Sequence, residues 1–180
     1  NRSIEEPEEF WSEMAQNFHW FKSWKEVRSY NYDMDRSPVD VKWFAGAKTN
    51  VCYNCVDRHL EVRPDKTAII WEGNEPGEDS TISFRNLHIQ VCKFANVLKN
   101  RGVKKGDRVS IYMPMVMEAT IAMLACARIG AVHSVVFGGF SAEALADRIV
   151  DSNCKTLITA NGTFRGPKAI PMKPNADQAM

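Results

Sequence analysis

The sequence has 180 residues, of which 44% are hydrophobic, which is enough for one ordinary domain with a real core. Lysine and arginine total 23 and aspartate and glutamate total 22, so the net charge is +1, and no overall field favours DNA, RNA or anionic lipid. No apolar run approaches the roughly 20 residues that span a bilayer, and no signal peptide precedes the first polar segment. We therefore expect neither nucleic-acid nor membrane partners.

Residues 1–45 differ in pattern from the rest of the chain. The segment "PEEFWSEMAQNFHW" predicts a helix, because its apolar residues recur at helical spacing after Pro7. An aromatic-rich stretch without a regular pattern follows, from Trp20 to Phe44. It lacks the basic clusters that accompany base stacking, so its rings are expected to pack onto a larger body. We predict a helical and irregular N-terminal arm over residues 1–45.

Residues 46–180 predict the first part of an α/β domain that is incomplete within this chain. Helices are expected at 49–64, 84–102, 117–131 and 141–152, and strands at 66–73, 81–84, 107–114, 131–137 and 155–160. Asn50 or Thr49, Ser83 and Ser141 are candidate N-caps, and Gly102 is a candidate helix end. Because the strands from residue 66 onward alternate with helices, they should lie parallel in one sheet. The continuous apolar runs "IYM", "VVF" and "LIT" indicate coverage on both faces, so the fold class is a three-layer α/β body.

The five cysteines predict a reduced set of thiols. They are Cys52, Cys55, Cys92, Cys126 and Cys154, an odd number. This favours a cytosol-like compartment, so we expect a cytoplasmic protein, while a mitochondrial or nuclear form stays open. Cys52, Cys55 and His59 have C-x2-C-x3-H spacing on the first predicted helix of the α/β part, with Val51, Cys55, Val56 and Leu60 expected to face inward. A structural zinc site takes four ligands and no second pair exists, so we predict no metal site.

Two junctions in the α/β part are candidate ligand sites. Gly138 and Gly139 follow a predicted strand, where the backbone can turn tightly or approach a ligand, and Glu143 suits the first turn of the next helix. From the residues alone, a plain strand-to-helix turn and a ligand-facing turn both stay open. The segment "NGTFRGPKAIPMK" then places Arg165, Lys168 and Lys173 in a Gly/Pro loop after the last predicted strand. Such a loop either holds a phosphate-bearing ligand or is simply solvated.

Several segments together resemble the acetyl-CoA synthetase family, the AMP-forming acetate–CoA ligases of the acyl-adenylate-forming superfamily. They are "VKWFAGAKTNVCYNCVDRHLE", "DKTAIIWEGNEPGE", "KKGDRVSIYMPMVMEATIAMLACARIGAVHSVVFGGFSAEALADRI" and "FRGPKAIPMK". The resemblance covers essentially the whole chain, and propionyl-CoA synthetase shares much of the third segment. It implies activation of acetate with Mg-ATP to acetyl-AMP, and then transfer of the acetyl group to coenzyme A. ATP, Mg²⁺, coenzyme A and acetate are the small molecules implied, while the oligomeric state is not.

The resemblance also implies which residues bind. Arg165, Gly166, Pro167 and Lys168 match the segment that binds coenzyme A, with the basic side chains on its 3′-phosphate. Gly138 and Gly139 match a turn close to the pantetheine path. The family's phosphate-gripping loop, adenine-binding segments and adenylation lysine would lie after Met180. We therefore predict no catalytic residue here and an inactive 180-residue chain. The alternatives are a truncated, non-catalytic nucleotide- or partner-binding chain and the corresponding part of propionyl-CoA synthetase. His133 is expected to be a core histidine.

Overall fold

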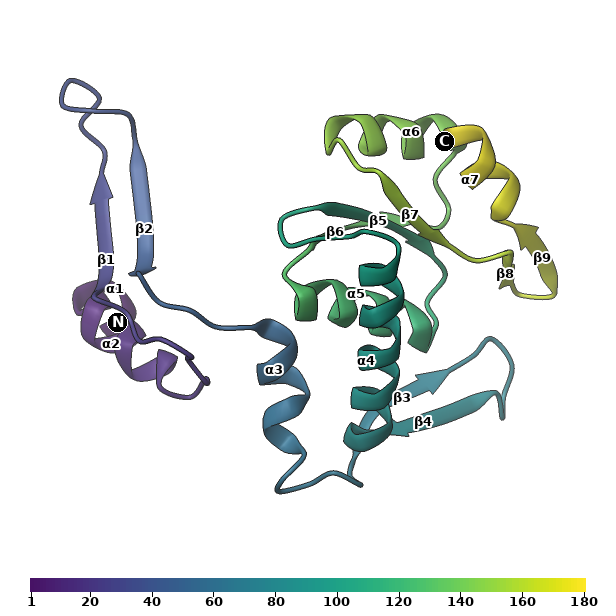
Figure 1. Ribbon diagram of the computed structural model, residues 1–180, viewed down its shortest axis with the longest axis horizontal. Coiled ribbons are helices and arrows are strands. Elements are labelled where there is room, and N and C mark those ends of the chain that lie inside the picture. Colours follow the sequence, from purple (N-terminus) through teal and green to yellow (C-terminus); the bar gives the residue numbers. More distant parts are fainter. The chain divides into compact units, whose positions relative to one another are not determined.

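The computed structural model describes residues 1–180 (Figure 1). The chain divides into two compact units, residues 1–54 and residues 55–180, and each is described by itself. A membrane-spanning helix is not among its elements, since none is both long and apolar enough.

The first unit contains short helices and a β-hairpin. Its elements are α1 (Arg2–Glu5), α2 (Pro7–Ala15), β1 (Glu26–Asn31) and β2 (Asp40–Ala45). The predicted helix after Pro7 is confirmed, with Pro7 in the first turn, where its fixed φ and missing N–H cost nothing.

The aromatic stretch after α2 is a hairpin, so the prediction of an irregular segment was wrong. β1 and β2 pair antiparallel with Arg28 opposite Trp43, and the Arg28 guanidinium lies 5.8 Å from the Trp43 ring centre. The Trp20 ring lies 5.3 Å from the rings of both Trp24 and Phe44. These aromatic and cation–π contacts favour the hairpin, and those of Trp20 with Phe44 and of Arg28 with Trp43 join residues that are distant in sequence.

The second unit begins at the last residue of α3 (Val51–Cys55). Its further elements are the 3-10 helix η1 (Asp57–His59), β3 (Thr67–Glu72), β4 (Asp79–Ser83), α4 (Phe84–Asn100), β5 (Arg108–Met113), α5 (Met117–Ile129), β6 (Val132–Phe137), α6 (Ala142–Asp151), β7 (Thr156–Thr159), β8 (Gly162–Arg165), β9 (Lys168–Pro171) and α7 (Lys173–Ala179).

Three strands form a parallel sheet in the order β6-β5-β7. The central strand β5 is covered on both faces, since its residues from Val109 to Tyr112 are at most 1% exposed. The chain passes from β5 to β6 through α5 and then to the far side of β5 through α6. Right-handed crossovers in opposite directions place these two helices on opposite faces. Figure 1 shows α6 and α7 on one side of the sheet and α4 and α5 on the other, which confirms the three-layer α/β body.

Two predicted strands behave differently from the expectation of one fully covered parallel sheet. β3 pairs antiparallel with β4 in a separate hairpin and does not join the parallel sheet, because a short turn brings these two strands together. β6 lies at the sheet edge, and its Val132, Val135 and Phe137 side chains are exposed, with only Val136 fully buried. Its apolar run is thus covered on part of its surface only.

The predicted helix ends are largely confirmed. The hydroxyl of Ser83 accepts a 3.3 Å hydrogen bond from the backbone N–H of Asn86, so it caps α4. Gly102 follows that helix with a φ of 88°, the left-handed conformation that glycine adopts easily. The side chain of Asn50 accepts a 3.1 Å bond from the N–H of Tyr53 and so caps α3.

The helix that begins after Asn50 is shorter than predicted, and the face that it buries differs from the predicted face. It ends at Cys55 and is followed by η1. Cys52 and Val56 are fully buried, whereas Val51 and Cys55 are exposed. The prediction that Val51 and Cys55 face inward was therefore wrong, because the apolar stripe is displaced by one residue.

Candidate functional site

Arg165 and Lys168 lie opposite each other at the tip of the β8–β9 hairpin. They pair in register on either side of the two-residue turn Gly166–Pro167. Gly166 has a φ of 56°, which suits a tight hairpin turn with glycine at its first central position. Both cations are exposed and neither has an ion-pair partner. Like charges directly across a hairpin are unfavourable, so this tip favours an anion.

The base of this hairpin is closed by the backbone. The carbonyl of Asn161 accepts hydrogen bonds from the N–H groups of Met172 at 2.9 Å and Lys173 at 3.2 Å. A Cβ on Gly162 would lie 2.8 Å from the carbonyl oxygen of Ile170, so the strands need glycine at this close approach. Because the hairpin starts directly after β7, it lies at the carboxyl edge of the parallel sheet, where ligands of open α/β sheets bind.

The turn at Gly138 and Gly139 lies at the same edge, since it follows the parallel strand β6. The N–H of Phe140 bonds to the carbonyl of Phe137 at 3.0 Å, and this closes a tight turn. A Cβ on Gly138 would lie 3.2 Å from Met172 Cε and 3.3 Å from the backbone oxygen of Met113. Gly138 therefore packs against the segment that follows β9. Gly139 would meet only the exposed ring of Phe137, so packing alone does not require a glycine there.

Tyr112 connects the centre of the sheet to the glycine turn and to α7, the helix that follows the hairpin. Its hydroxyl donates a 2.8 Å hydrogen bond to the carbonyl of Phe140 and receives a 3.4 Å bond from the amide of Asn175 in α7. The ring is 1% exposed and packs in a core cluster with Leu145 and Met172. Neither Tyr112 nor Asn175 was predicted from the sequence as a site residue. The only local signal for Tyr112 is the polar hydroxyl of a tyrosine within an apolar strand.

The start of α6 already carries its own negative charge. Ser141 caps this helix by accepting a 3.3 Å bond from the N–H of Ala144, as predicted. Glu143 lies in the first turn, and hydrogen bonds from its own backbone and from Ser141 lower the pKa of its carboxyl group. This carboxylate balances the positive end of the helix, so the glycine turn suits an uncharged part of a ligand better than a phosphate.

Two other candidate residues lie in different surroundings from those expected. Lys173 is the first residue of α7 and forms an ion pair with Asp177, so its charge is engaged and it is not part of the hairpin tip. His133 is exposed on the edge strand β6, and the prediction of a core histidine was wrong because nothing covers that position.

Comparison with known proteins identifies the family. Residues 56–179 match the family model described as AMP-binding enzyme. The chain belongs to this family. Residues 1–55 of this AMP-binding family member match a second model, described as the acetyl-coenzyme A synthetase N-terminus.

Curated relatives of this AMP-binding family member are similar over the whole chain. It is 56% identical over 180 residues to an acetyl-coenzyme A synthetase of Desulfatibacillum aliphaticivorans, covering 100% of the chain and 27% of the relative. It is 58% identical to an acetyl-coenzyme A synthetase of Saccharophagus degradans and 53% identical to that of Vibrio cholerae, each time covering 99% of the chain and 27% of the relative. The chain thus spans about a quarter of the length of these relatives.

Proposed function

We propose that these residues form the N-terminal part of an acetate–CoA ligase that activates acetate with ATP to acetyl-AMP and transfers the acetyl group to coenzyme A. The relatives that match along the whole chain carry the name acetyl-coenzyme A synthetase, and this supports the reaction. The part of the reaction assigned to these residues is binding of coenzyme A at the carboxyl edge of the sheet.

The observation that carries this assignment is the pairing of Arg165 with Lys168 at the hairpin tip. Two uncompensated cations directly across a turn fit a phosphate, with the arginine as a fork of donors and the lysine as a point charge. We assign the 3′-phosphate of coenzyme A to this tip, together with backbone contacts at Gly166 and Pro167.

The glycine turn is assigned to the uncharged pantetheine arm. Gly139 leaves its backbone accessible, and Glu143 nearby would repel a phosphate. Gly138 supports this turn by packing against Met172, which follows the hairpin. A single extended ligand would then contact both segments along the sheet edge.

When bound, coenzyme A supplies the thiol that accepts the acetyl group. We assign none of these residues to ATP or Mg²⁺ and none to the chemical steps. Residues 1–180 would orient the thiol carrier, which lowers the cost of bringing it to the acyl-adenylate.

The test separates the two half-reactions in the complete ligase. Arg165→Gln should raise the KM for coenzyme A about tenfold, since an exposed charge-assisted contact contributes about 1–2 kcal/mol. Acetate-dependent exchange of pyrophosphate into ATP, which needs no coenzyme A, should stay unchanged. With dephospho-coenzyme A, which lacks the 3′-phosphate, wild-type enzyme and variant should have the same KM.

Lys173→Gln is the matched control, because Lys173 is close in sequence but engaged by Asp177. It should leave the KM for coenzyme A unchanged. An Arg165→Gln effect that persists with dephospho-coenzyme A would remove the 3′-phosphate from the hairpin tip. Absence of acetate-dependent exchange in the complete wild-type protein would overturn the proposed reaction itself.

A further inference from the structure

Asn161 is the only asparagine of this sequence that is followed by glycine. Its side chain is exposed, and its amide group forms no hydrogen bond in the structure. In such a pair the backbone nitrogen of the glycine can attack the side-chain amide carbon, because glycine has no side chain that obstructs the approach. The pair lies at the base of the β8–β9 hairpin, directly after β7.

The N–H of Gly162 is not used by the hydrogen-bond ladder of the hairpin. The N–H of Met172 donates to the carbonyl of Asn161 at 2.9 Å, so these two residues occupy a hydrogen-bonded position of the antiparallel pair. The next position, Gly162 opposite Pro171, is non-hydrogen-bonded, because the two kinds alternate and proline has no N–H. β8 pairs with no other strand. The nitrogen of Gly162 is therefore available to react.

The peptide group that contains this nitrogen is also polarised. Its carbonyl, that of Asn161, accepts the N–H groups of Met172 at 2.9 Å and Lys173 at 3.2 Å. When the Gly162 nitrogen loses its proton, negative charge develops on this carbonyl oxygen, and donors that are already in place stabilise such a charge. The closure of the hairpin base thus favours the nucleophilic form of the nitrogen.

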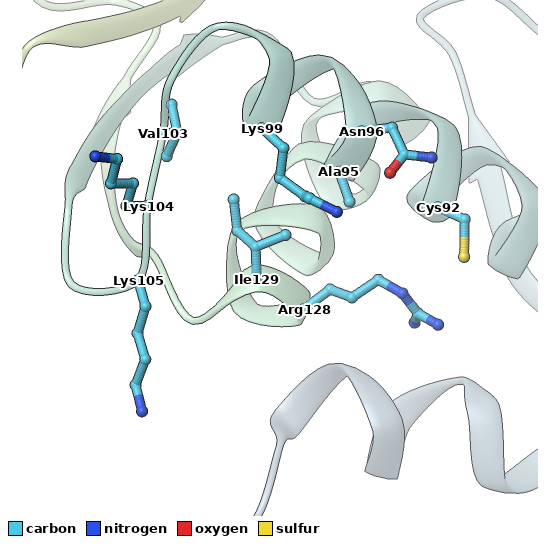
Figure 2. Close-up of a pocket in the computed structure, with 9 residues that line it drawn as sticks. All are labelled: Cys92, Ala95, Asn96, Lys99, Val103, Lys104, Lys105, Arg128 and Ile129. Carbon is cyan, nitrogen blue, oxygen red and sulfur yellow. The ribbon is translucent and has the colours of Figure 1, made fainter.

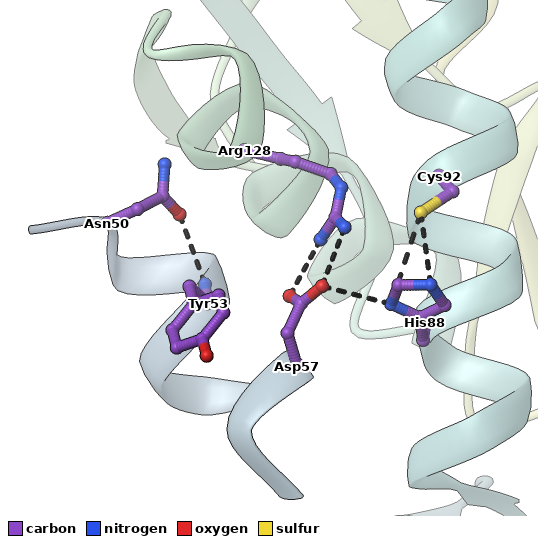
Figure 3. A network of polar contacts seen from close by, with 6 residues as sticks. All are labelled: Asn50, Tyr53, Asp57, His88, Cys92 and Arg128. Atoms are coloured by element: carbon purple, nitrogen blue, oxygen red, sulfur yellow. Dashed lines mark hydrogen bonds and ion pairs between the residues drawn. The ribbon is translucent and has the colours of Figure 1, made fainter. Parts of the chain in front are cut away.

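Other asparagines lack this combination of features. Asn96 lies on α4, where it lines a pocket (Figure 2), and the backbone N–H groups in the interior of this helix bond to carbonyls one turn earlier. The side chain of Asn50 accepts a 3.1 Å hydrogen bond from the N–H of Tyr53 (Figure 3), and the branched side chain of Val51 follows it. Either the amide carbon or the following nitrogen is thus engaged or obstructed.

We propose that the Asn161–Gly162 pair is a site of spontaneous deamidation that converts the base of the hairpin into an isoaspartate linkage. The nitrogen of Gly162 attacks Cγ of Asn161, a carbon–nitrogen bond forms, and the side-chain nitrogen leaves as ammonia with the proton of the attacking N–H. Water then opens the resulting cyclic imide. Opening at the side-chain carbonyl gives aspartate, and opening at the main-chain carbonyl gives isoaspartate. Water is the only other reactant.

The isoaspartate product alters how the hairpin is held. Its main chain runs through Cβ and Cγ and is longer by one atom, while the former carbonyl of Asn161 becomes a free carboxylate. Met172 and Lys173 then bind a group through which the chain no longer passes, so β8 shifts relative to β9. This shift and the added negative charge weaken the phosphate contacts of Arg165 and Lys168, a consequence that rests on the function proposed above.

The modification is tested in the complete ligase, incubated for days at neutral pH. Peptide mapping by mass spectrometry measures deamidation at each asparagine and separates isoaspartate from aspartate. Asn74 is the internal control, because it is exposed but the N–H of the following Glu75 lies 3.4 Å from a carboxylate oxygen of Glu78. Asn161 should deamidate at least about tenfold faster than Asn74, which corresponds to a barrier lower by about 1.4 kcal/mol. An Asn161 rate no greater than that of Asn74 would overturn the proposal.

A second measurement tests the consequence. During the same incubation the KM for coenzyme A should rise, while acetate-dependent exchange of pyrophosphate into ATP stays constant. Treatment with an isoaspartyl methyltransferase, which converts isoaspartate to aspartate, should lower the KM again. The variant Asn161→Gln should keep its initial KM throughout, because the larger ring that glutamine requires closes much more slowly.

The outcomes separate this proposal from the proposed function. Isoaspartate at position 161 with an unchanged KM would overturn the consequence for coenzyme A binding. A KM that rises equally in Asn161→Gln would show that another change of the protein is responsible. Absence of acetate-dependent exchange in the fresh enzyme would overturn the ligase reaction alone, since the deamidation rates are measured without it.

Discussion

The hydroxyl of Tyr112 donates a 2.8 Å hydrogen bond to the carbonyl of Phe140, and this bond ties the central strand to the turn at Gly138 and Gly139. Because Asn175 also bonds to this hydroxyl, one buried side chain positions both the glycine turn and the helix that follows the hairpin. The glycine turn and α7 therefore share a single support.

Tyr112→Phe tests this support. The substitution keeps the ring and leaves the carbonyl of Phe140 without its donor, so the free energy of unfolding should fall by about 1–2 kcal/mol. Denaturant unfolding measures the change, and in the complete ligase the KM for coenzyme A should rise as the turn loses its position. Tyr30→Phe is the control, because the Tyr30 side chain is exposed on β1, and it should change neither quantity. Equal stability of the two variants would show that the Tyr112 bond does not support the turn.

The two neighbouring glycines should respond differently to alanine. Gly138→Ala places a Cβ against Met172 and the fixed backbone oxygen of Met113, so it should lower the unfolding free energy by about 1–2 kcal/mol through overpacking. Gly139→Ala meets only an exposed ring and should leave stability within about 0.5 kcal/mol. In the complete ligase, Gly139→Ala should raise the KM for coenzyme A without affecting pyrophosphate exchange. If Gly139→Ala changes neither stability nor KM, the turn does not face the ligand.

Cys126 should make stability sensitive to alkaline pH. Its thiol is fully buried in α5, and desolvation, together with nearby Cys154, raises its pKa from 9.0 to about 11. Below pH 9 the thiol is neutral in both states and has no effect. Between pH 9 and 11 the unfolded chain loses this proton and the folded chain keeps it, so stability falls with rising pH, by at most about 2 kcal/mol.

The variant Cys126→Ala isolates this contribution, because lysines and tyrosines also titrate in that range. The decline in unfolding free energy from pH 9 to 11, measured by urea titration, should be steeper for the wild-type chain than for the variant. Parallel declines would contradict the assignment.

The exposed face of β6 should cause the 180-residue chain to associate. Val135 and Phe137 are exposed on one face of this edge strand, which also has free backbone groups on one side. Sedimentation velocity should show a mass that increases with concentration. Val135→Lys places a charge in the middle of this face and should shift the chain towards monomer. A wild-type chain that stays monomeric at high concentration would contradict this expectation.

The sequence predicted best those features that depend on neighbouring residues. Ser83 and Ser141 cap helices because each hydroxyl accepts a hydrogen bond from the backbone N–H three residues later. Gly102 follows α4 because glycine adopts a positive φ easily, which is again a local property. The β1–β2 hairpin of the first unit was not predicted, because the pairing of Arg28 with Trp43 joins two segments that are separated in sequence by a turn.

In the candidate site, too, local features could be predicted from the sequence and features that depend on distant residues could not. Arg165 and Lys168 were recognisable as a basic segment, but their placement directly opposite each other depends on the hairpin register. The need for glycine at position 138 comes from Met172, which is 34 positions later in the sequence and could not be read locally.

The closure of the β8–β9 hairpin at Asn161 has a consequence for how this edge of the fold can vary. The Asn161 carbonyl accepts backbone hydrogen bonds from Met172 and Lys173. Since no side chain takes part, the base of the hairpin stays closed whatever side chains occupy its tip. The residues at the tip of the segment from Gly162 to Pro171 can thus change without changing the backbone contacts that hold the segment on the sheet. Its tip residues could be exchanged, by evolution or by grafting, to suit another carrier group while the three-stranded scaffold beneath is left untouched.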